Sequence, residues 1–278
     1  MEFVKLNNGL EMPMLGYGCF KVEDGQVTVD SVKCALELGY RSIDTAAIYG
    51  NEQSVGQAMK ESGVPREEIF LTTKLWNSDQ RSGEVEAAFQ KSLTELGTDY
   101  VDLYLIHWPA KGHIVDAWLK MEAIYKSGRA KAIGISNFEP HHIEEIKKVW
   151  TVVPQMNQFE MHPYLSQKPL IEVCKKENIV PQSWSPLGGS WNDGTQDSLL
   201  DHPTLKEIGA KYGKSAAQVI LRWNIDLGVV VIPKSVTPSR IADNLNLFDF
   251  KLTAEDIAAI DALNQDRRSG PHPDEITF

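Results

Sequence analysis

Eight short runs rich in β-branched and aromatic residues alternate with amphipathic segments along this chain. The runs span 15–20, 41–46, 69–75, 101–107, 131–137, 154–160, 179–185 and 228–235. The amphipathic segments have the apolar spacing of helices and span 26–38, 51–62, 82–96, 116–127, 139–149, 167–177, 215–227 and, in two pieces, 238–263. Strands that alternate with helices form a parallel sheet, and eight such units in 278 residues favour a closed (β/α)8 TIM barrel.

The segment before the first run predicts a β-hairpin. In VKLNNGLEMP the turn residues Asn7, Asn8 and Gly9 separate two short strand-like stretches. We expect this hairpin to lie across the bottom of the barrel. No linker, low-complexity tract or block of like charge interrupts the chain, so residues 1–278 are expected to form a single domain of a size that α/β barrels commonly reach.

An open, doubly wound sheet that binds a dinucleotide is the alternative fold. Its signature is a GxGxxG turn directly after a strand. Gly16 and Gly18 lack the third glycine of that motif. The sequence therefore favours the barrel.

Charge and composition argue against several classes of partner. The net charge of −10 disfavours a general nucleic-acid or anionic-membrane binder. The longest apolar runs are strand-sized, far short of the ~20 residues of a membrane helix, and the N-terminus lacks the regions of a signal peptide. Cys19, Cys34 and Cys174 form no CxxC motif, which fits a reducing compartment. We expect a cytoplasmic monomer without a nucleic-acid or membrane partner.

Three successive predicted strands each carry a polar residue at or near the carboxyl end, where a core strand would not favour one. Asp44 follows RSI, Lys74 lies in FLTTKLW, and His107 ends VDLYLIH. Barrel enzymes build their active sites at these strand ends and in the following loops, and Tyr49 lies in the loop after Asp44. A buried lysine needs a partner, which a carboxylate one strand away can supply. These four residues predict proton chemistry at the mouth of the barrel.

Three longer motifs carry a resemblance to a known family. GYRSIDTAAIYGNEQSVG (39–56), AIGISNF (132–138) and IPKSVTPSRI (232–241) each resemble a signature of the aldo-keto reductases, and they occur in the family's order. The likeness runs nearly end to end, and the chain is similar to bacterial members that act on methylglyoxal or 2,5-diketo-D-gluconate. The resemblance implies an enzyme that reduces aldehydes and ketones to alcohols with NADPH.

In that family a catalytic tetrad occupies the positions of Asp44, Tyr49, Lys74 and His107. The resemblance implies that hydride passes from the nicotinamide to the carbonyl carbon while Tyr49 protonates the oxygen. A free tyrosine has a pKa near ~10, which a nearby ammonium lowers, so we expect Lys74 to make Tyr49 a better acid. Asp44 would keep Lys74 charged, and a neutral His107 would donate to the carbonyl oxygen. The structural alternative is a buried Asp–Lys pair with a hydrogen-bonded tyrosine and a core histidine.

The last predicted strand leads into a second functional segment. IPKS is followed by Thr237 and Pro238, which suit the cap and the first turn of a helix. Backbone N–H groups and the helix dipole then face an incoming phosphate. Lys234 and Arg240 add two cations. Many barrels bind phosphate at this place.

The resemblance implies a cofactor site for NADPH or NADP+ around this segment. It assigns Lys234, Ser235 and Arg240 to the 2′-phosphate and adenine. It assigns Trp184 to stacking on the nicotinamide ring. The carboxamide contacts that it implies are Ser136, Asn137 and Gln158, and the further cofactor contacts are Ser185 and Leu187 along the pyrophosphate, with Val236 and Asn244.

The substrate pocket is expected to be wide. The connection after the fourth strand, 109–118, is shorter than in the better-known animal members of the family, and short loops leave the pocket open. Phe20, Trp76 and Trp108 are its expected apolar walls, and Trp191 lies in a loop rich in Gly, Ser and Asp that can fold over bound cofactor. Such a pocket predicts a preference for reactive carbonyls, namely small 2-oxoaldehydes and aromatic aldehydes.

Two other function classes stay open at this point. A phosphate-binding barrel isomerase or aldolase would use Lys74 as a Schiff-base or acid–base lysine, but it would leave Tyr49 without a role. A non-catalytic NADPH-binding regulatory barrel would keep the fold, although the intact tetrad disfavours it. No metal is expected from the remaining histidines, which lack metal-ligand spacing with a Cys or Asp cluster: His141, His142, His162 and His202.

Overall fold

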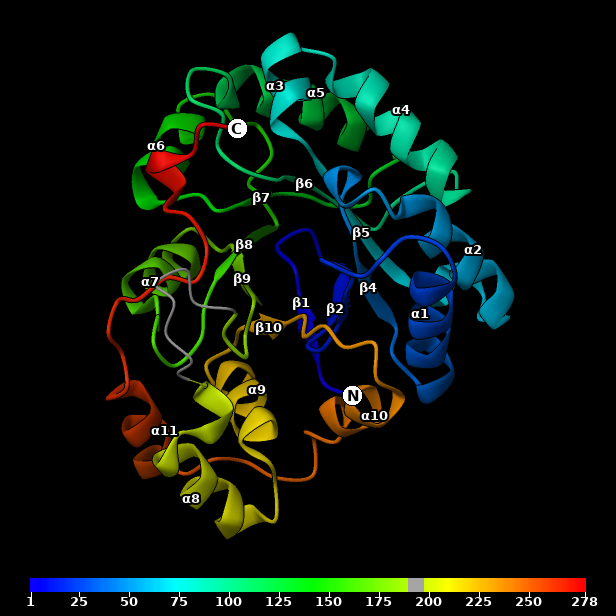
Figure 1. The fold of residues 1–278 in the computed structure, drawn as a ribbon. Helices are drawn as coiled ribbons and strands as arrows, with labels where there is room; N and C mark the ends of the chain where they lie inside the picture. The colour runs from blue at the N-terminus through cyan, green and yellow to red at the C-terminus, as the bar shows by residue number, and fades with distance from the viewer. Residues whose placement is uncertain (190–197) are drawn as a thin grey trace.

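Eight parallel strands surround the centre of the molecule in a computed structural model of the chain (Figure 1). The structure describes residues 1–189 and 198–278. The strands follow their sequence order along the sheet and are β3 (Tyr17–Gly18), β4 (Ser42–Asp44), β5 (Phe70–Leu75), β6 (Leu103–Ile106), β7 (Ile133–Ser136), β8 (Met156–Glu160), β9 (Val180–Trp184) and β10 (Val230–Val231). Each of these strands lies within one of the runs predicted from the sequence.

Backbone hydrogen bonds join the first strand to the last and close the barrel. The Gly16 N–H donates to the Val231 carbonyl at 2.8 Å, and the Gly18 N–H donates to the Pro233 carbonyl at 3.1 Å. A Cβ atom on Gly18 would lie 2.7 Å from the Ile232 carbonyl oxygen, so this close approach requires glycine. Gly16 and Gly18 thus serve barrel closure, and the predicted (β/α)8 barrel is confirmed.

Helices pack around the outside of the barrel (Figure 1). They are α1 (Gln26–Leu38), α2 (Glu52–Ser62), α3 (Asn77–Ser82), α4 (Val85–Leu96), α5 (Ile114–Lys126), α6 (Pro140–Lys147), α7 (Lys168–Lys176), α8 (Pro203–Tyr212), α9 (Ala216–Asp226), α10 (Pro238–Leu245) and α11 (Ala254–Asp261). Except in α3, their buried apolar side chains join those of the strands in one core.

The sequence analysis does not anticipate two of these helices, α3 and α8. Helix α3 lacks an apolar period, since its only buried residues are Asn77 and Gln80. It ends at Gly83, whose φ is +76°, so the helix expected from residue 82 begins at Val85 instead. Helix α8 contains Gly209, which weakens a helical signal, but a Cβ there would collide with the backbone after the helix.

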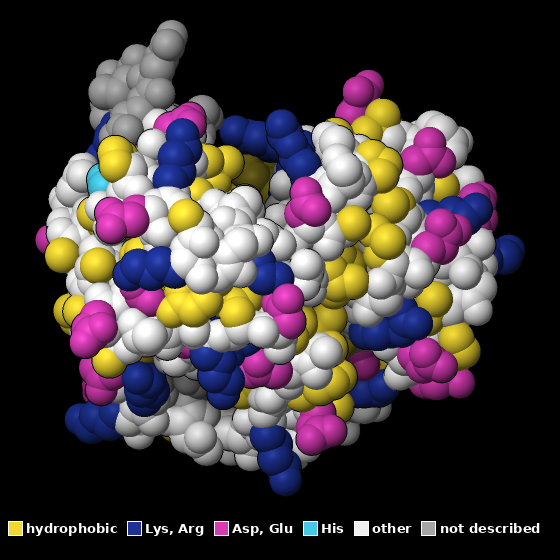
Figure 2. Space-filling model, turned by 90° about the horizontal axis from the view of Figure 1, so that it is seen from below, with side chains coloured by type: hydrophobic (Ala, Val, Ile, Leu, Met, Phe, Trp, Pro, Cys, Tyr) yellow, Lys and Arg dark blue, Asp and Glu magenta, His cyan; other side chains and the backbone are white. Residues whose placement is uncertain are grey.

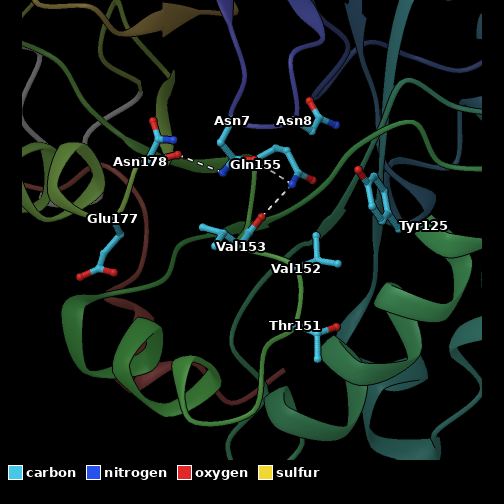
Figure 3. A pocket seen from close by; sticks show the side chains of 9 residues that line it. All are labelled: Asn7, Asn8, Tyr125, Thr151, Val152, Val153, Gln155, Glu177 and Asn178. Atoms are coloured by element: carbon cyan, nitrogen blue, oxygen red, sulfur yellow. Dashed lines mark hydrogen bonds between the residues drawn. The ribbon is translucent and has the colours of Figure 1, made fainter.

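The predicted N-terminal hairpin is present as β1 (Phe3–Lys5) and β2 (Glu11–Pro13). In its turn, the Asn7 amide donates to the carbonyls of Pro154 at 2.9 Å and Asn178 at 3.0 Å. These carbonyls precede β8 and β9, so the hairpin covers the amino ends of the strands. Figure 3 shows the turn beside a pocket at this end of the barrel. Barrels place their chemistry at the other end, so this face serves stability.

Charged side chains of both signs are interspersed over the face shown in Figure 2. At its upper edge, lysine and arginine side chains stand beside a hollow that contains hydrophobic groups. Among the helices in the described ranges, none has the length and apolar character to cross a membrane.

Candidate active site

The residues expected to form the tetrad meet at the carboxyl ends of the strands. Asp44 ends β4, Lys74 lies in β5, and His107 directly follows β6. Tyr49 ends a short 3-10 helix (Ala47–Tyr49) that follows β4. The Lys74 Nζ donates to Asp44 Oδ1 at 2.5 Å and to Tyr49 Oη at 3.3 Å. The ring centroids of Tyr49 and His107 lie 5.5 Å apart, so the structure brings all four side chains together.

Lys74 is fully buried, and its charge depends on its neighbours. Burial lowers the pKa of Lys74, but the Asp44 carboxylate and the Tyr49 hydroxyl bring that pKa above its ordinary value. The Thr45 carbonyl accepts a third hydrogen bond from Nζ at 2.9 Å. Every proton of the ammonium therefore has an acceptor, and Lys74 stays charged beside Tyr49.

Burial raises the pKa of Tyr49 to about 12, although the Lys74 ammonium acts in the opposite direction. The expected lowering by Lys74 is present, but loss of water around the phenolate outweighs it, so the pKa lies above the ordinary ~10. Tyr49 therefore keeps its proton at neutral pH, and Lys74 limits the rise rather than reversing it.

His107 is neutral at this mouth. Burial and the Lys74 ammonium lower the pKa of His107 well below its ordinary value. Its Nδ1 has no hydrogen-bond partner among the described residues, and the Trp76 ring lies 5.2 Å from its own. A neutral imidazole carries one N–H, which can donate to a carbonyl oxygen held between these rings.

Gln158 in β8 reaches the tetrad across the interior of the barrel. Its Nε2 donates to Asp44 Oδ2 at 2.7 Å and to Gln182 Oε1 at 2.8 Å. Because β4 and β8 lie on opposite sides of the barrel (Figure 1), the bond to Asp44 spans the barrel centre. Both N–H groups of the amide are thereby engaged, and its oxygen is left for a ligand.

Asn137 fixes the Trp184 indole beside the mouth. Its Oδ1 accepts from Trp184 Nε1 at 2.8 Å, and its Nδ2 donates to the His107 carbonyl at 2.9 Å. Ser136 Oγ donates to the Gln158 carbonyl at 2.9 Å. The Asn137 amide, which the resemblance assigns to a carboxamide, is thus already engaged in holding Trp184.

The start of α10 offers free positive charge. Lys234 and Arg240 are exposed, and neither forms an ion pair with a carboxylate in the described part of the chain. Thr237 is the N-cap, but its hydroxyl makes no capping hydrogen bond, contrary to the prediction. Its N–H donates instead to Ser235 Oγ at 3.1 Å. First-turn N–H groups that a side chain does not cap remain available to phosphate.

The other residues expected to contact the cofactor follow β9, precede α10 or lie within α10. Ser185 and Leu187 follow β9 and are partly exposed, and Ser185 has a left-handed φ of +48°. Val236 is exposed just before α10, and Asn244 is buried within it. The Tyr17 hydroxyl donates to the Ser235 carbonyl at 2.7 Å, which fixes the segment that leads into α10.

Three of the four expected pocket walls stand around the tetrad. Phe20 is 52% exposed, and its ring centroid lies 5.1 Å from that of Tyr49. Trp76 borders His107, and the Trp108 ring lies 6.3 Å from the Trp184 ring. Trp191 lies outside the described residues.

A further wall, Phe278, was absent from the sequence predictions. Its ring stacks on Trp76 at 5.3 Å and meets Trp108 edge-on at 5.6 Å. Its carbonyl accepts from Arg81 at 2.5 Å, a contact between positions 197 residues apart. Local sequence carries no signal for such a contact. Phe278 therefore adds an aromatic ring beside the expected walls Trp76 and Trp108.

A buried carboxylate, also not predicted, holds the C-terminal segment against the site. Glu160 at the end of β8 accepts hydrogen bonds from Ser269 N and Oγ, both at 2.5 Å, and from Gly270 N at 3.1 Å. A Cβ atom on Gly270 would lie 2.5 Å from the Trp184 ring. Glycine there lets the segment pack directly on the indole.

The fold also places His141 and His142 next to Asp274. Their Nε2 atoms lie 2.9 and 3.2 Å from Asp274 Oδ1, within reach of one metal ion. However, His142 Nδ1 accepts the Glu139 N–H at 3.1 Å, so the proton of the neutral ring is on Nε2 and faces Asp274. We read this cluster as an anchor for the C-terminal segment, and the absence of a metal stays a prediction.

Comparison with known proteins supplies a family for this geometry. Residues 14–265 match the model of the aldo/keto reductase family. Glyoxal reductase of Bacillus subtilis (strain 168) is 53% identical over 277 residues, covering 100% of this chain and 98% of that protein. Methylglyoxal reductase DkgA of Salmonella typhimurium is 45% identical, covering 98% and 97%. The crystal structure of a Bombyx mori aldo-keto reductase in complex with NADP aligns with a TM-score of 0.92 at 37% identity, covering 98% and 96%.

Proposed function

We propose that this chain, which belongs to the aldo/keto reductase family, reduces small 2-oxoaldehydes such as methylglyoxal and glyoxal, with Tyr49 as the proton donor. Family membership makes the chain an NADP-dependent oxidoreductase that reduces carbonyl groups. The narrower proposal concerns which carbonyls it prefers and which residues act on them. The observation that carries it is the contact of the Lys74 ammonium with both Asp44 and Tyr49.

The residues at the start of α10 and beside the tetrad fit NADPH in charge and in hydrogen-bonding capacity. Lys234 and Arg240 carry positive charge without a partner in the described chain, beside an uncapped helix start. A 2′-phosphate is a suitable counter-ion for such a pair. The free oxygen of Gln158 suits the N–H groups of a carboxamide. We therefore assign the adenine end of the cofactor to α10 and its nicotinamide end to the tetrad.

Proton delivery is the part that this chain's own residues perform. Bound NADPH supplies the hydride. The neutral His107 donates a hydrogen bond that orients the carbonyl oxygen, and Tyr49 gives its proton to that oxygen. Lys74 stabilises the phenolate that results, while Asp44 keeps Lys74 charged and in place.

The pocket walls support a small, activated substrate. Phe20, Trp76, Trp108 and Phe278 present aromatic surface around the tetrad, with few polar groups to recognise a long polar substrate. Discrimination then depends mainly on the reactivity of the carbonyl. We include aromatic aldehydes as secondary substrates and diketo-gluconate as a further one.

A side-by-side substrate series tests the proposal. The kcat/KM values of methylglyoxal, a nitro-substituted benzaldehyde, glucose and acetone are measured from the loss of NADPH absorbance at fixed NADPH. The two activated aldehydes should exceed glucose and acetone, because an electron-poor carbonyl lowers the barrier to hydride transfer. A clear preference for glucose or acetone would show a recognition element that the aromatic walls do not provide.

The same series separates the two other function classes. A regulatory barrel would bind NADPH without oxidising it with any carbonyl, and a phosphate-sugar isomerase or aldolase would not need NADPH.

We also propose that residues 1–278 fold as one domain and act as a cytoplasmic monomer. Three cysteines without disulfides support the reducing compartment, and light scattering on the purified protein tests the monomer.

A further inference from the structure

Gln182 is a polar residue in the interior of the barrel. It lies in the middle of β9, is fully buried, and pairs in register with Gln158 on β8. Register partners on neighbouring strands point to the same face of a sheet, and Gln158 points inward because it reaches Asp44 across the barrel. An apolar side chain would be easier to bury at this position than an amide.

The hydrogen bonds of Gln182 are incomplete in a specific way. Its Oε1 accepts from Gln158 Nε2, whereas its own Nε2 has no partner in the described part of the chain. Turning the Gln182 amide over would place its NH2 against the NH2 of Gln158. If Gln158 turned over in response, it would lose its hydrogen bond to Asp44 Oδ2 as well. The unpaired Nε2 is thus the consequence of holding Gln158 in one orientation.

We infer that Gln182 is a positioning residue, which together with Asp44 holds the Gln158 amide so that only its oxygen is presented to the nicotinamide carboxamide. Gln158 Oε1 accepts no hydrogen bond from a described residue. Unlike Gln182 Nε2, however, it is not fully enclosed by protein atoms. This oxygen is therefore available to a bound group. An oxygen in this position accepts from the carboxamide NH2 and rejects a group that lacks an N–H.

The same amide connects the cofactor contact to the proton donor. Gln158 holds Asp44 Oδ2, and Lys74 holds Asp44 Oδ1. A continuous line of hydrogen bonds therefore runs from Gln182 through Gln158, Asp44 and Lys74 to Tyr49. Gln182 touches neither cofactor nor substrate in this scheme, and it acts only through the orientation of Gln158. This inference rests on the proposed function, because it requires a bound nicotinamide.

The test compares NADPH with its reduced 3-acetylpyridine analogue, whose acetyl group has no N–H. Dissociation constants are measured by quenching of tryptophan fluorescence, without any substrate. The unaltered chain should prefer NADPH by about tenfold, the value of one good hydrogen bond. Gln182→Met should reduce that preference to about threefold, because Asp44 is then the only acceptor that holds the NH2 group of Gln158 in place. In Gln182→Glu, burial and the nearby Asp44 carboxylate favour the protonated acid. Its carbonyl oxygen still accepts from Gln158, so this variant should keep the preference of the unaltered chain.

Ser183→Ala is the matched control. Ser183 adjoins Gln182 on β9, is equally buried, and donates to the Met161 carbonyl at 2.7 Å. This variant loses a buried hydrogen bond without touching Gln158, so its cofactor preference should equal that of the unaltered chain. Gln182→Leu, measured in parallel, provides a second apolar replacement in case the Met variant folds poorly.

Turnover gives a second readout in the same variants. The kcat for methylglyoxal should fall severalfold in Gln182→Met, because Gln158, which holds Asp44 Oδ2, loses one of its own two acceptors, and it should stay near that of the unaltered chain in Gln182→Glu. An unchanged cofactor preference in folded Gln182→Met and Gln182→Leu would overturn the inference while leaving carbonyl reduction intact. Absence of any preference in the unaltered chain would overturn it together with the assignment of Gln158 to the carboxamide.

Discussion

Lys74 occupies the position on which the proposed proton chemistry depends. A buried ion pair such as Lys74 with Asp44 gains little net stability over an apolar pair, because both charges lose their water. The ion pair instead keeps the Lys74 ammonium within 3.3 Å of the Tyr49 hydroxyl, to which it donates a hydrogen bond. The interior of the barrel thus contains a charge that a purely structural core would not need.

Removing Lys74 alone should harm both stability and activity. Lys74→Met leaves the Asp44 carboxylate buried without a counter-charge, so the free energy of unfolding should fall by about 3 kcal/mol. Turnover should fall about 10²-fold, because the phenolate of Tyr49 loses its stabilising cation. Urea unfolding and methylglyoxal turnover measure the two effects.

The double variant Lys74→Met with Asp44→Asn serves as the control. It removes both charges, so it should recover most of the lost stability but none of the lost activity. Recovery of activity in the double variant would contradict the role given to Lys74.

The pH dependence of reduction follows from the protonation states of Tyr49 and His107. A general acid must be protonated, so activity falls only as pH rises through the Tyr49 pKa of about 12. His107 stays neutral above its lowered pKa. We expect kcat/KM for an uncharged aldehyde to stay level from about pH 6.5 to about pH 9. A decline with a midpoint near neutral pH would show that another group titrates in the reaction.

At the scale of secondary-structure elements, we propose that α10 decides which cofactor is bound. Its uncapped start and the cations Lys234 and Arg240 favour the 2′-phosphate that distinguishes NADPH from NADH. Arg240→Ala should weaken NADPH binding by roughly tenfold or more and leave NADH binding nearly unchanged, because one charge-assisted hydrogen bond is lost. Fluorescence titration with the two cofactors measures the ratio of their affinities.

Lys251→Ala is a suitable control for this experiment. Lys251 is also exposed, and it lies outside α10, so its removal changes net charge by the same amount. An equal loss of NADPH affinity in both variants would mean that overall charge, and not the α10 site, accounts for the effect.

The elements of the barrel were predictable to different degrees. The eight strands and most helices follow from periodic apolar residues, which are a local property of the sequence. Helix α3 escaped prediction because it buries Asn77 and Gln80 rather than an apolar stripe. Thr237 lies at the expected helix start, but its hydroxyl makes no capping hydrogen bond. The N–H of Thr237 donates to Ser235 Oγ instead.

At the scale of the whole molecule, the barrel gathers distant parts of the chain at one mouth. The motifs predicted the site because Asp44, Lys74 and His107 lie at or near the carboxyl ends of predicted strands. Tyr49 lies in the loop that follows one of them. Contacts of the C-terminal segment, such as Phe278 on Trp76, could not be predicted, since they join distant positions and depend on the path of the chain after α11. The raised pKa of Tyr49 was missed for a similar reason, because burial is a property of the complete fold.

The central claim is that Tyr49 delivers a proton at a mouth where NADPH reduces a carbonyl. Its most direct test is the turnover of methylglyoxal by Tyr49→Phe at saturating NADPH, with NADPH affinity measured in the same protein. Loss of the hydroxyl should lower kcat by about 10²-fold or more, because general acid catalysis is lost, while NADPH affinity stays nearly the same. Undiminished turnover by Tyr49→Phe, with unchanged NADPH affinity, would contradict the claim and would mean that another group supplies the proton.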